Sequence, residues 1–282
     1  MDAPLPLPPL LLARPPATEI LARAPLKTDQ GTLHAFDPVS GSAPSCPDFS
    51  GVQLYPDALS REQARKFLDQ IEKQPFSAAQ SGKLKQHAGA KINFNKRRMK
   101  LARFRGLPES AKRLEALARD LIGADPTCPS ECVQAFADFT TTDFFALRYI
   151  ETEGSNLDFH RDDRFGYGEA ILDISLDSDS VLTFIRPRAT RERTEKSQDS
   201  VGPAAPTNKP APPDGPIECV RVPLPARSIA VLYGAARFEW EHAILAYDIR
   251  GTRTSITLRT LSDTLRQTED GQKVLKIADT TL

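Results

Sequence analysis

The sequence has few cysteines, no excess of charge of either sign and no long apolar run. Four cysteines in 282 residues are too few for a disulfide scaffold, so we expect a protein of the reducing nucleus and cytoplasm. The 37 basic residues balance the 37 acidic ones, which excludes a protein that coats polyanions through its net charge. No segment approaches the roughly 20 consecutive apolar residues that span a bilayer, and we therefore expect no membrane partner.

Proline is concentrated in two segments, 1–30 and 187–216, which together hold more than half of the 24 prolines. Such a composition buries little apolar surface and is typical of disordered or loosely held chain. We therefore predict a proline-rich, disordered tail over residues 1–47, a folded domain over 48–282 and a proline-rich surface insertion over 187–217.

Helical patterns precede strand patterns along the predicted domain. Ser60 and Gln63 form a capping-box pattern ahead of apolar residues at helical spacing, and leucines repeat at that spacing over 109–122. From about residue 132 apolar and polar residues alternate, including a run over 238–244 that we expect to be a strand. This order predicts an α+β, mainly β fold, in which an antiparallel sandwich or barrel carries helices packed outside.

Two histidines and one aspartate are candidates for a metal site. His160 and Asp162 are two residues apart, so on an extended segment their side chains point to the same side. His242 shares a face of its predicted strand with Trp240 and Phe238, and a histidine directed inward among aromatic residues needs a hydrogen-bond partner or a metal. Two histidines and one carboxylate with open coordination positions are typical of a non-haem iron(II) oxygenase site.

Arg253 and Arg259 lie on the polar face of a cleanly alternating stretch. If that face points into a barrel, the two guanidinium groups require anions. Six residues of strand span about 20 Å, and two side chains of roughly 6–7 Å leave a gap that suits a short dicarboxylic acid such as 2-oxoglutarate. The alternative is a solvated outer face with two exposed arginines.

Five sequence blocks resemble one known family, the AlkB-like iron(II)- and 2-oxoglutarate-dependent dioxygenases. The blocks are PFSAAQSGKLKQHAGAKINF, GLPESAKRL, HRDD, PLPARSIAVLYGAARFEWEHAI and TSITLRTL. The resemblance covers residues 48–282 and implies a double-stranded β-helix (jelly-roll) barrel with its core over 130–262. It also implies iron(II), 2-oxoglutarate as co-substrate, and oxidative removal of N-methyl groups with release of succinate, carbon dioxide and formaldehyde.

The resemblance also implies a role for each of six residues. The implied iron ligands are His160, Asp162 and His242. Arg253 would pair with the distal carboxylate of 2-oxoglutarate, Arg259 would lie near its iron-side carboxylate, and Tyr149 would hydrogen-bond the same molecule.

Two positions depart from the family pattern. Leu147 stands where many members have an asparagine ahead of the equivalent tyrosine, so one hydrogen bond to the co-substrate is missing. Arg164 stands where DNA-repair members carry a base-contacting acid. Direct repair of alkylated bases is therefore not the activity we expect.

The segment 81–105 contains nine Lys or Arg residues and no acid. The family places its substrate lid in this part of the chain, here over 75–108, and the candidate lid residues are Lys83, Lys85, Lys91, Phe94, Arg97 and Arg98. Basic residues interleaved with aromatic ones suit a polyanion such as nucleic acid. A solvated basic face or a contact with an acidic protein suits the same charges equally well.

Two substrate classes remain open at this point, methyl-lysine in a protein and N6-methyladenine in nucleic acid. The branch of the family that the blocks resemble is associated with both. The alternative to an enzyme is a 2-oxoglutarate-binding jelly-roll protein that acts as a non-catalytic interaction module. We expect the protein to be a monomer.

Overall fold

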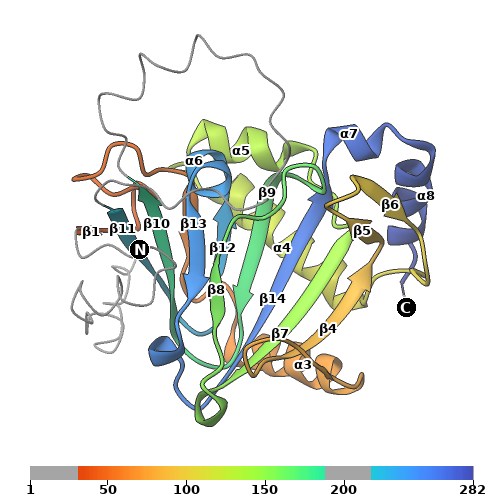
Figure 1. Cartoon of the computed structure of the whole chain (residues 1–282), viewed down its shortest axis with the longest axis horizontal. Helices are drawn as coiled ribbons and strands as arrows, with labels where there is room; N and C mark the ends of the chain where they lie inside the picture. Colours follow the sequence, from red (N-terminus) through yellow and green to blue (C-terminus); the bar gives the residue numbers. More distant parts are fainter. Residues whose placement is uncertain (1–30, 188–216, 282) are drawn as a thin grey trace.

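Two mostly antiparallel sheets and a layer of helices make up the computed structural model, which describes residues 31–187 and 217–281 (Figure 1). The strand order of the five-stranded sheet is β1 (Gly31–Ala35), β11 (Ile217–Leu224), β10 (Ser180–Pro187), β13 (Glu241–Ile244), β8 (Leu157–His160). The order of the seven-stranded sheet is β2 (Val52–Tyr55), β12 (Ile229–Leu232), β9 (Tyr167–Ser175), β14 (Thr252–Leu261), β7 (Asp143–Ile150), β4 (Leu84–Gly89), β3 (Ser77–Ala78). Strands β5 (Lys91–Asn93) and β6 (Arg98–Lys100) form a separate hairpin. Only β1 and β11 pair in parallel among these strands, so the described chain is mainly β, as the alternation predicted.

Successive side chains of the central strands point to opposite faces of the seven-stranded sheet. One face borders the core under the helices, and the other face borders a cavity. On β14, Ile256 and Leu258 belong to an apolar cluster shared with the helices. Ser255 and Thr257, one position away on the same strand, line a cavity on the opposite face of the sheet. Because side chains alternate along a strand, one sheet supplies both a helix-covered core and a wall of the cavity.

Four longer helices supply the rest of that core: α3 (Arg61–Glu72), α4 (Glu109–Ala124), α5 (Ser130–Ala137) and α8 (Glu269–Ala278). The predicted capping box is confirmed, because Gln63 N donates to Ser60 Oγ (3.1 Å) and Ser60 N donates to Gln63 Oε1 (2.8 Å). Phe67 of α3 and Leu114 of α4 are buried in the same cluster as Ile256. The short elements are η1 (Glu151–Glu153), α6 (Gly234–Phe238), η3 (Ala246–Asp248) and α7 (Asp263–Arg266).

None of the helices within 31–187 and 217–281 is long and apolar enough to cross a membrane.

The predicted disordered tail is wrong for residues 31–47. Strand β1 pairs with β11, and the loop that follows buries Ala43 and Cys46. The prolines of this stretch, Pro38, Pro44 and Pro47, lie in turns, where the fixed φ of proline is tolerated. Residues 1–30 and 188–216 lie outside the described residues, so the tail before residue 31 and the insertion stay predictions.

Two local strand predictions are also wrong. The alternation expected from about residue 132 begins only at β7, because Ser130–Ala137 forms α5 and buries Cys132 and Phe136, four residues apart on one helix face. Phe238 ends α6 instead of lying on a strand, and β13 begins at Glu241.

Candidate active site

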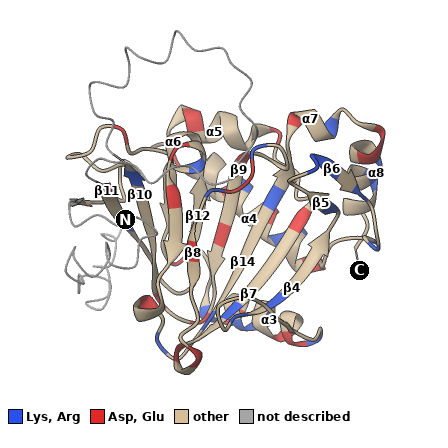
Figure 2. Ribbon diagram, viewed as in Figure 1, with Lys and Arg blue, Asp and Glu red and all other residues tan. Residues whose placement is uncertain are grey.

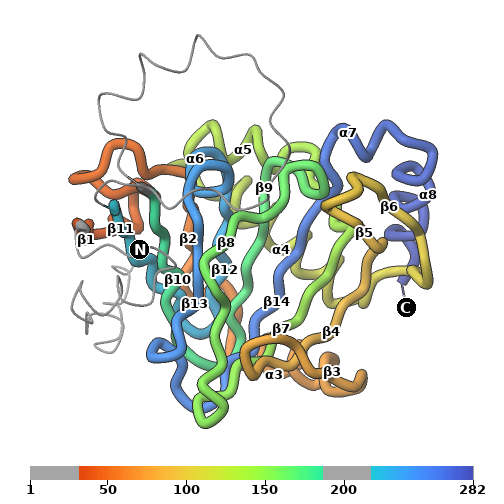
Figure 3. Tube along the Cα trace, viewed as in Figure 1, coloured from red at the N-terminus to blue at the C-terminus, as the bar shows by residue number. Residues whose placement is uncertain are grey.

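Three side chains predicted as metal ligands converge between β8 and β13. The two strands are antiparallel neighbours, and His160 and His242 are register partners with ring centroids 4.5 Å apart. Figure 3 shows the two strands side by side. Asp162 follows the end of β8, and ligand atoms of all three residues lie within 4.8 Å of one another. Residues 82 positions apart in the chain are thus brought into one cluster by strand pairing.

The electrostatics of this cluster favour forms that can bind a cation. Burial acts to raise the pKa of Asp162, but Arg259 and then the two histidines hold that pKa well below its usual range. Arg259 Nε donates to Asp162 Oδ1 (2.8 Å), while Oδ2 lies 3.6 Å from His242 Nε2. Burial lowers the pKa of His242 to about 3, so its imidazole is neutral at neutral pH.

The orientation of both rings is consistent with metal binding. His160 Nδ1 donates a hydrogen bond to the carbonyl oxygen of Asp158 (2.9 Å). With the proton of the neutral ring on Nδ1, the lone pair of Nε2 is available to a metal. His242 Nδ1 is buried and has no hydrogen-bond partner among the described residues. Two imidazole nitrogens and a carboxylate, with further positions open, form the donor set that suits non-haem iron(II).

A cavity of about 650 Å³ opens on these three side chains. Its walls include residues of β7, β9, β13 and β14, and it is lined by Tyr149, Arg253 and Arg259 among others. The predicted inward face of β14 is therefore confirmed, and the alternative of two solvated arginines is wrong. Arg253 is fully buried, which requires compensation for its charge.

Arg253 is held at one end of the cavity by neighbouring strands. Its Nη2 donates to Ser175 Oγ (2.9 Å) and lies 3.7 Å from Asp173 Oδ2. The guanidinium carbon stacks 5.3 Å from the ring centre of Tyr149, its register partner on β7. Arg253 Nε is buried without a hydrogen-bond partner among the described residues, so one donor of this cationic group is left unsatisfied by the protein.

Arg259 lies at the metal end of the same cavity and contacts two acids. Besides Asp162, its Nη1 is 3.3 Å from Asp143 Oδ2. Asp143 Oδ1 in turn accepts from His87 Nε2 on β4 (2.6 Å). A chain of polar contacts thus runs from strand β4 to the predicted metal ligand Asp162.

Sequence reasoning missed Asp143, Asp173 and Ser175. His87 lies in the basic segment, and nothing in the spacing of the sequence links it to Asp143, 56 residues away. Asp173 and Ser175 could have been found, because both fall on the inward face of an alternating strand.

Four of the six candidate lid residues line the cavity or a depression next to it, and two line neither. Lys83, Lys85 and Phe94 line the cavity. Arg97 lines an adjacent depression that it shares with Phe94. Lys91 and Arg98 are exposed on the β5–β6 hairpin and belong to neither lining. Figure 2 shows the basic positions gathered on this hairpin.

Lys83 differs from the other lid cations because it is buried. Its Nζ donates to the carbonyl oxygen of Asn156. Burial lowers the pKa of Lys83, although Asp158 opposes that change. Lys83 therefore fixes β4 to the loop before β8, whereas Lys85 is only partly buried.

Comparison with known proteins identifies relatives over most of the chain. The human alpha-ketoglutarate-dependent dioxygenase alkB homolog 4 is 34% identical over 238 residues, which are 82% of this chain and 74% of the relative. The DNA N6-methyl adenine demethylase of Caenorhabditis elegans is 26% identical over 212 residues, 75% of this chain and 60% of the relative. The solved structure of OsALKBH1 matches with a TM-score of 0.47 at 11% identity, covering 74% of this chain and 97% of that one. No protein-family model matches the chain.

Proposed function

The chain belongs to the AlkB family of 2-oxoglutarate (alpha-ketoglutarate)-dependent dioxygenases, and from this premise we propose that it removes the methyl group of N6-methyladenine in nucleic acid. As a member of the family it is an iron(II)- and 2-oxoglutarate-dependent dioxygenase with demethylase activity. The proposed fold is a double-stranded β-helix whose two sheets enclose the cavity. The observation that carries the proposal is that one cavity is lined both by two histidines and an aspartate able to bind iron(II) and by the buried Arg253.

His160, Asp162 and His242 would hold iron(II). Their ligating forms are supported by the low pKa values of Asp162 and His242. Together with 2-oxoglutarate and dioxygen, the bound metal supplies the oxidation that places one oxygen atom on the N-methyl carbon and the other in succinate, with loss of carbon dioxide. The hydroxymethylamine product then releases formaldehyde. Arg259 keeps Asp162 ionised and oriented through the 2.8 Å hydrogen bond.

Arg253 would bind the distal carboxylate of 2-oxoglutarate, with Tyr149 beside it. The free Nε of Arg253 supports this role, because a carboxylate would satisfy that donor. Burial raises the pKa of the Tyr149 hydroxyl, although Arg253 opposes that change. Tyr149 therefore remains a neutral hydrogen-bond donor. Leu147 lines the same cavity and offers no polar atom.

The mouth of the cavity supports a nucleic-acid substrate. A depression of about 630 Å³ next to the metal ligands is lined by two aromatic residues, three arginines and three acids: Phe94, Phe165, Arg97, Arg161, Arg164, Asp162, Asp163 and Glu241. Phe94 is 41% exposed, and Arg97 stacks 4.9 Å from the ring centre of Phe165. The exposed ring of Phe94 can stack on an extruded base, and the exposed arginines can bind the flanking phosphates.

The test is turnover of two matched substrates with iron(II), 2-oxoglutarate and dioxygen. We expect formaldehyde and succinate from an oligonucleotide that carries N6-methyladenine, and none from a methyl-lysine peptide. His160→Ala should abolish both products. Release of formaldehyde from the peptide alone would make methyl-lysine the substrate, and a wild-type protein that forms no succinate would favour the non-catalytic binding module.

A matched pair of variants tests the mouth separately. Arg97→Ala should weaken binding of the oligonucleotide, whereas Lys91→Ala on the same hairpin should not, because Lys91 lines neither the cavity nor the depression. The KM for 2-oxoglutarate should be unchanged in both variants. Equal effects of the two substitutions would contradict a specific role for the mouth.

A further inference from the structure

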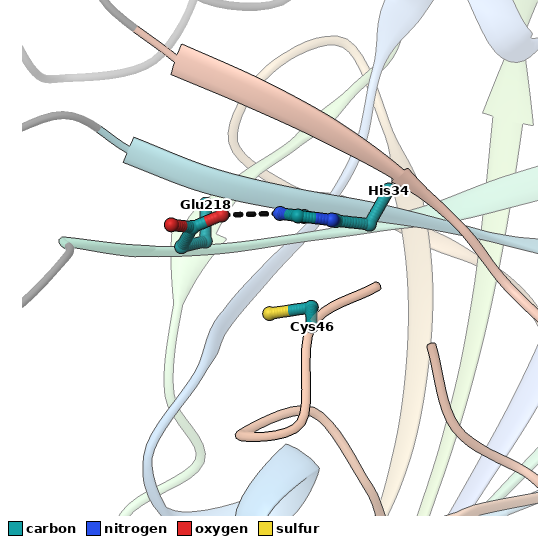
Figure 4. A group of neighbouring side chains, drawn as sticks. All are labelled: His34, Cys46 and Glu218. Carbon is teal, nitrogen blue, oxygen red and sulfur yellow. Dashed lines mark hydrogen bonds and ion pairs between the residues drawn. The ribbon is translucent and has the colours of Figure 1, made fainter. Parts of the chain in front are cut away.

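A second cluster of metal-ligating side chains lies at the far edge of the five-stranded sheet. His34 comes from β1, Cys46 from the loop that follows β1, and Glu218 from β11. One ligand atom of each lies within 4.8 Å of the other two. Figure 4 shows the imidazole pointing at the Glu218 carboxylate, with the Cys46 sulfur close to both. Strands β11 and β10 separate β1 from β13, so this cluster is distinct from the site around His242.

All three side chains are withdrawn from solvent, with His34 9%, Cys46 5% and Glu218 7% exposed. A buried imidazole and carboxylate can satisfy each other, and His34 Nε2 does contact Glu218 Oε2. That ion pair alone gives no reason for a thiol to lie against it. A thiol, an imidazole and a carboxylate that meet at one buried point form a ligand set for a divalent cation.

The outer contacts of the cluster also suit metal binding. His34 Nδ1 hydrogen-bonds Ser45 Oγ (2.9 Å), which fixes the ring with Nε2 toward Glu218. A cation bound at this point would release the proton of the thiol to solvent and stabilise the thiolate.

We propose that His34, Cys46 and Glu218 bind one zinc ion, with a water molecule as fourth ligand. Thiolate sulfur and imidazole nitrogen favour zinc over the oxygen-seeking magnesium and calcium ions. Four-coordinate sites with three protein ligands and one solvent ligand are within the geometry that zinc accepts.

The ion would tie together segments that support the wall behind His242. Cys46 lies two residues before Asp48, whose carbonyl oxygen accepts from Trp240 Nε1 (3.2 Å). The next residue, Phe49, packs edge-on against Trp240 (5.0 Å) and Phe184 (5.1 Å). The Phe184 ring lies 5.7 Å from the ring of His242. Loss of zinc from this position should therefore lower the melting temperature of the whole chain.

Cobalt(II) titration of the metal-free full-length protein tests the proposal. Cobalt bound to a thiolate gives a sulfur-to-metal charge-transfer band in the near ultraviolet, and the His160–Asp162–His242 cluster has no sulfur. We expect two equivalents of cobalt to bind, one of them with the band. His160→Ala should lose one equivalent and keep the band, so failure of the iron site is distinguishable from failure of the zinc site.

Two variants assign the sulfur. Cys46→Ser should lose the band and one equivalent of metal, whereas Cys219→Ser should keep both, although Cys219 is a buried neighbour of Glu218. If Cys46→Ser does not fold, the triple variant C128A/C132A/C219A decides, because Cys46 is then the only cysteine and the band must persist. Absence of the band from the wild-type protein, or its loss from the triple variant while the fold is retained, overturns the proposal.

Discussion

Arg253→Ala should raise the concentration of 2-oxoglutarate that the enzyme requires, with little change in its affinity for iron(II). The guanidinium is fully buried and stacked on Tyr149, and its Nε awaits an acceptor. Truncating one partner of a buried, hydrogen-bonded charge pair costs about 2–5 kcal/mol. At about 1.4 kcal/mol per factor of ten, this cost corresponds to an increase in the Kd for 2-oxoglutarate of between about 30-fold and several thousand-fold.

Isothermal titration calorimetry of the metal-loaded, anaerobic protein measures this Kd directly. The Kd of Arg253→Lys should lie between those of the wild type and Arg253→Ala, because lysine keeps the charge but lacks the planar guanidinium group. The matched control is Arg148→Ala. Arg148 lies on the neighbouring strand β7, but it contacts Glu72 and Phe76 on the opposite face of the sheet. Affinity for 2-oxoglutarate should not change in the control. A fall in iron affinity with an unchanged Kd for 2-oxoglutarate would refute the assigned role of Arg253.

Three further substitutions test the remaining parts of the structure. Asp162→Ala should abolish binding of iron(II) measured by metal analysis after desalting, whereas Asp158→Ala should retain it, because only the carbonyl oxygen of Asp158 contacts His160. Asp143→Ala removes a charge-assisted hydrogen bond to Arg259 worth about 1.5–3 kcal/mol. Because Arg259 orients Asp162, the affinity for iron(II) should fall about ten- to hundredfold; an unchanged affinity would mean that Arg259 is positioned without Asp143. Phe49→Ala leaves a cavity among three aromatic rings and should lower the free energy of unfolding in urea by about 3–5 kcal/mol, whereas Val39→Ala, at a side chain 73% exposed, should have no effect.

The sequence predicted the parts of the fold that are set by local periodicity. The inward face of β14 follows from strict alternation between Arg253 and Arg259, and the start of α3 follows from the side chain of Ser60. The error at Phe238 has the same origin, because a five-residue helix is too short to show a helical period. Helix α5 was missed for the same reason, since Cys132 and Phe136 supply a single helical repeat.

Contacts between distant segments were the part that local pattern could not supply. Asp143 and His87 are 56 residues apart, and their pairing depends on the register of β4 against β7. Likewise, β1 joins the five-stranded sheet through a parallel pairing with β11, 186 positions further along, so proline content alone placed the boundary of the domain too late. The monomeric state, the location in nucleus and cytoplasm, and the disorder of residues 1–30 and 188–216 stay predictions.

The most direct test of the active site is an anaerobic titration of the iron(II)-loaded protein with 2-oxoglutarate, followed by visible absorption. Chelation of iron by the 2-oxo acid gives a metal-to-ligand charge-transfer band. The band should saturate at one equivalent in the wild-type protein, require far more 2-oxoglutarate in Arg253→Ala, and be absent from Asp162→Ala. A band that survives in Asp162→Ala at wild-type intensity would mean that iron binds elsewhere in the molecule.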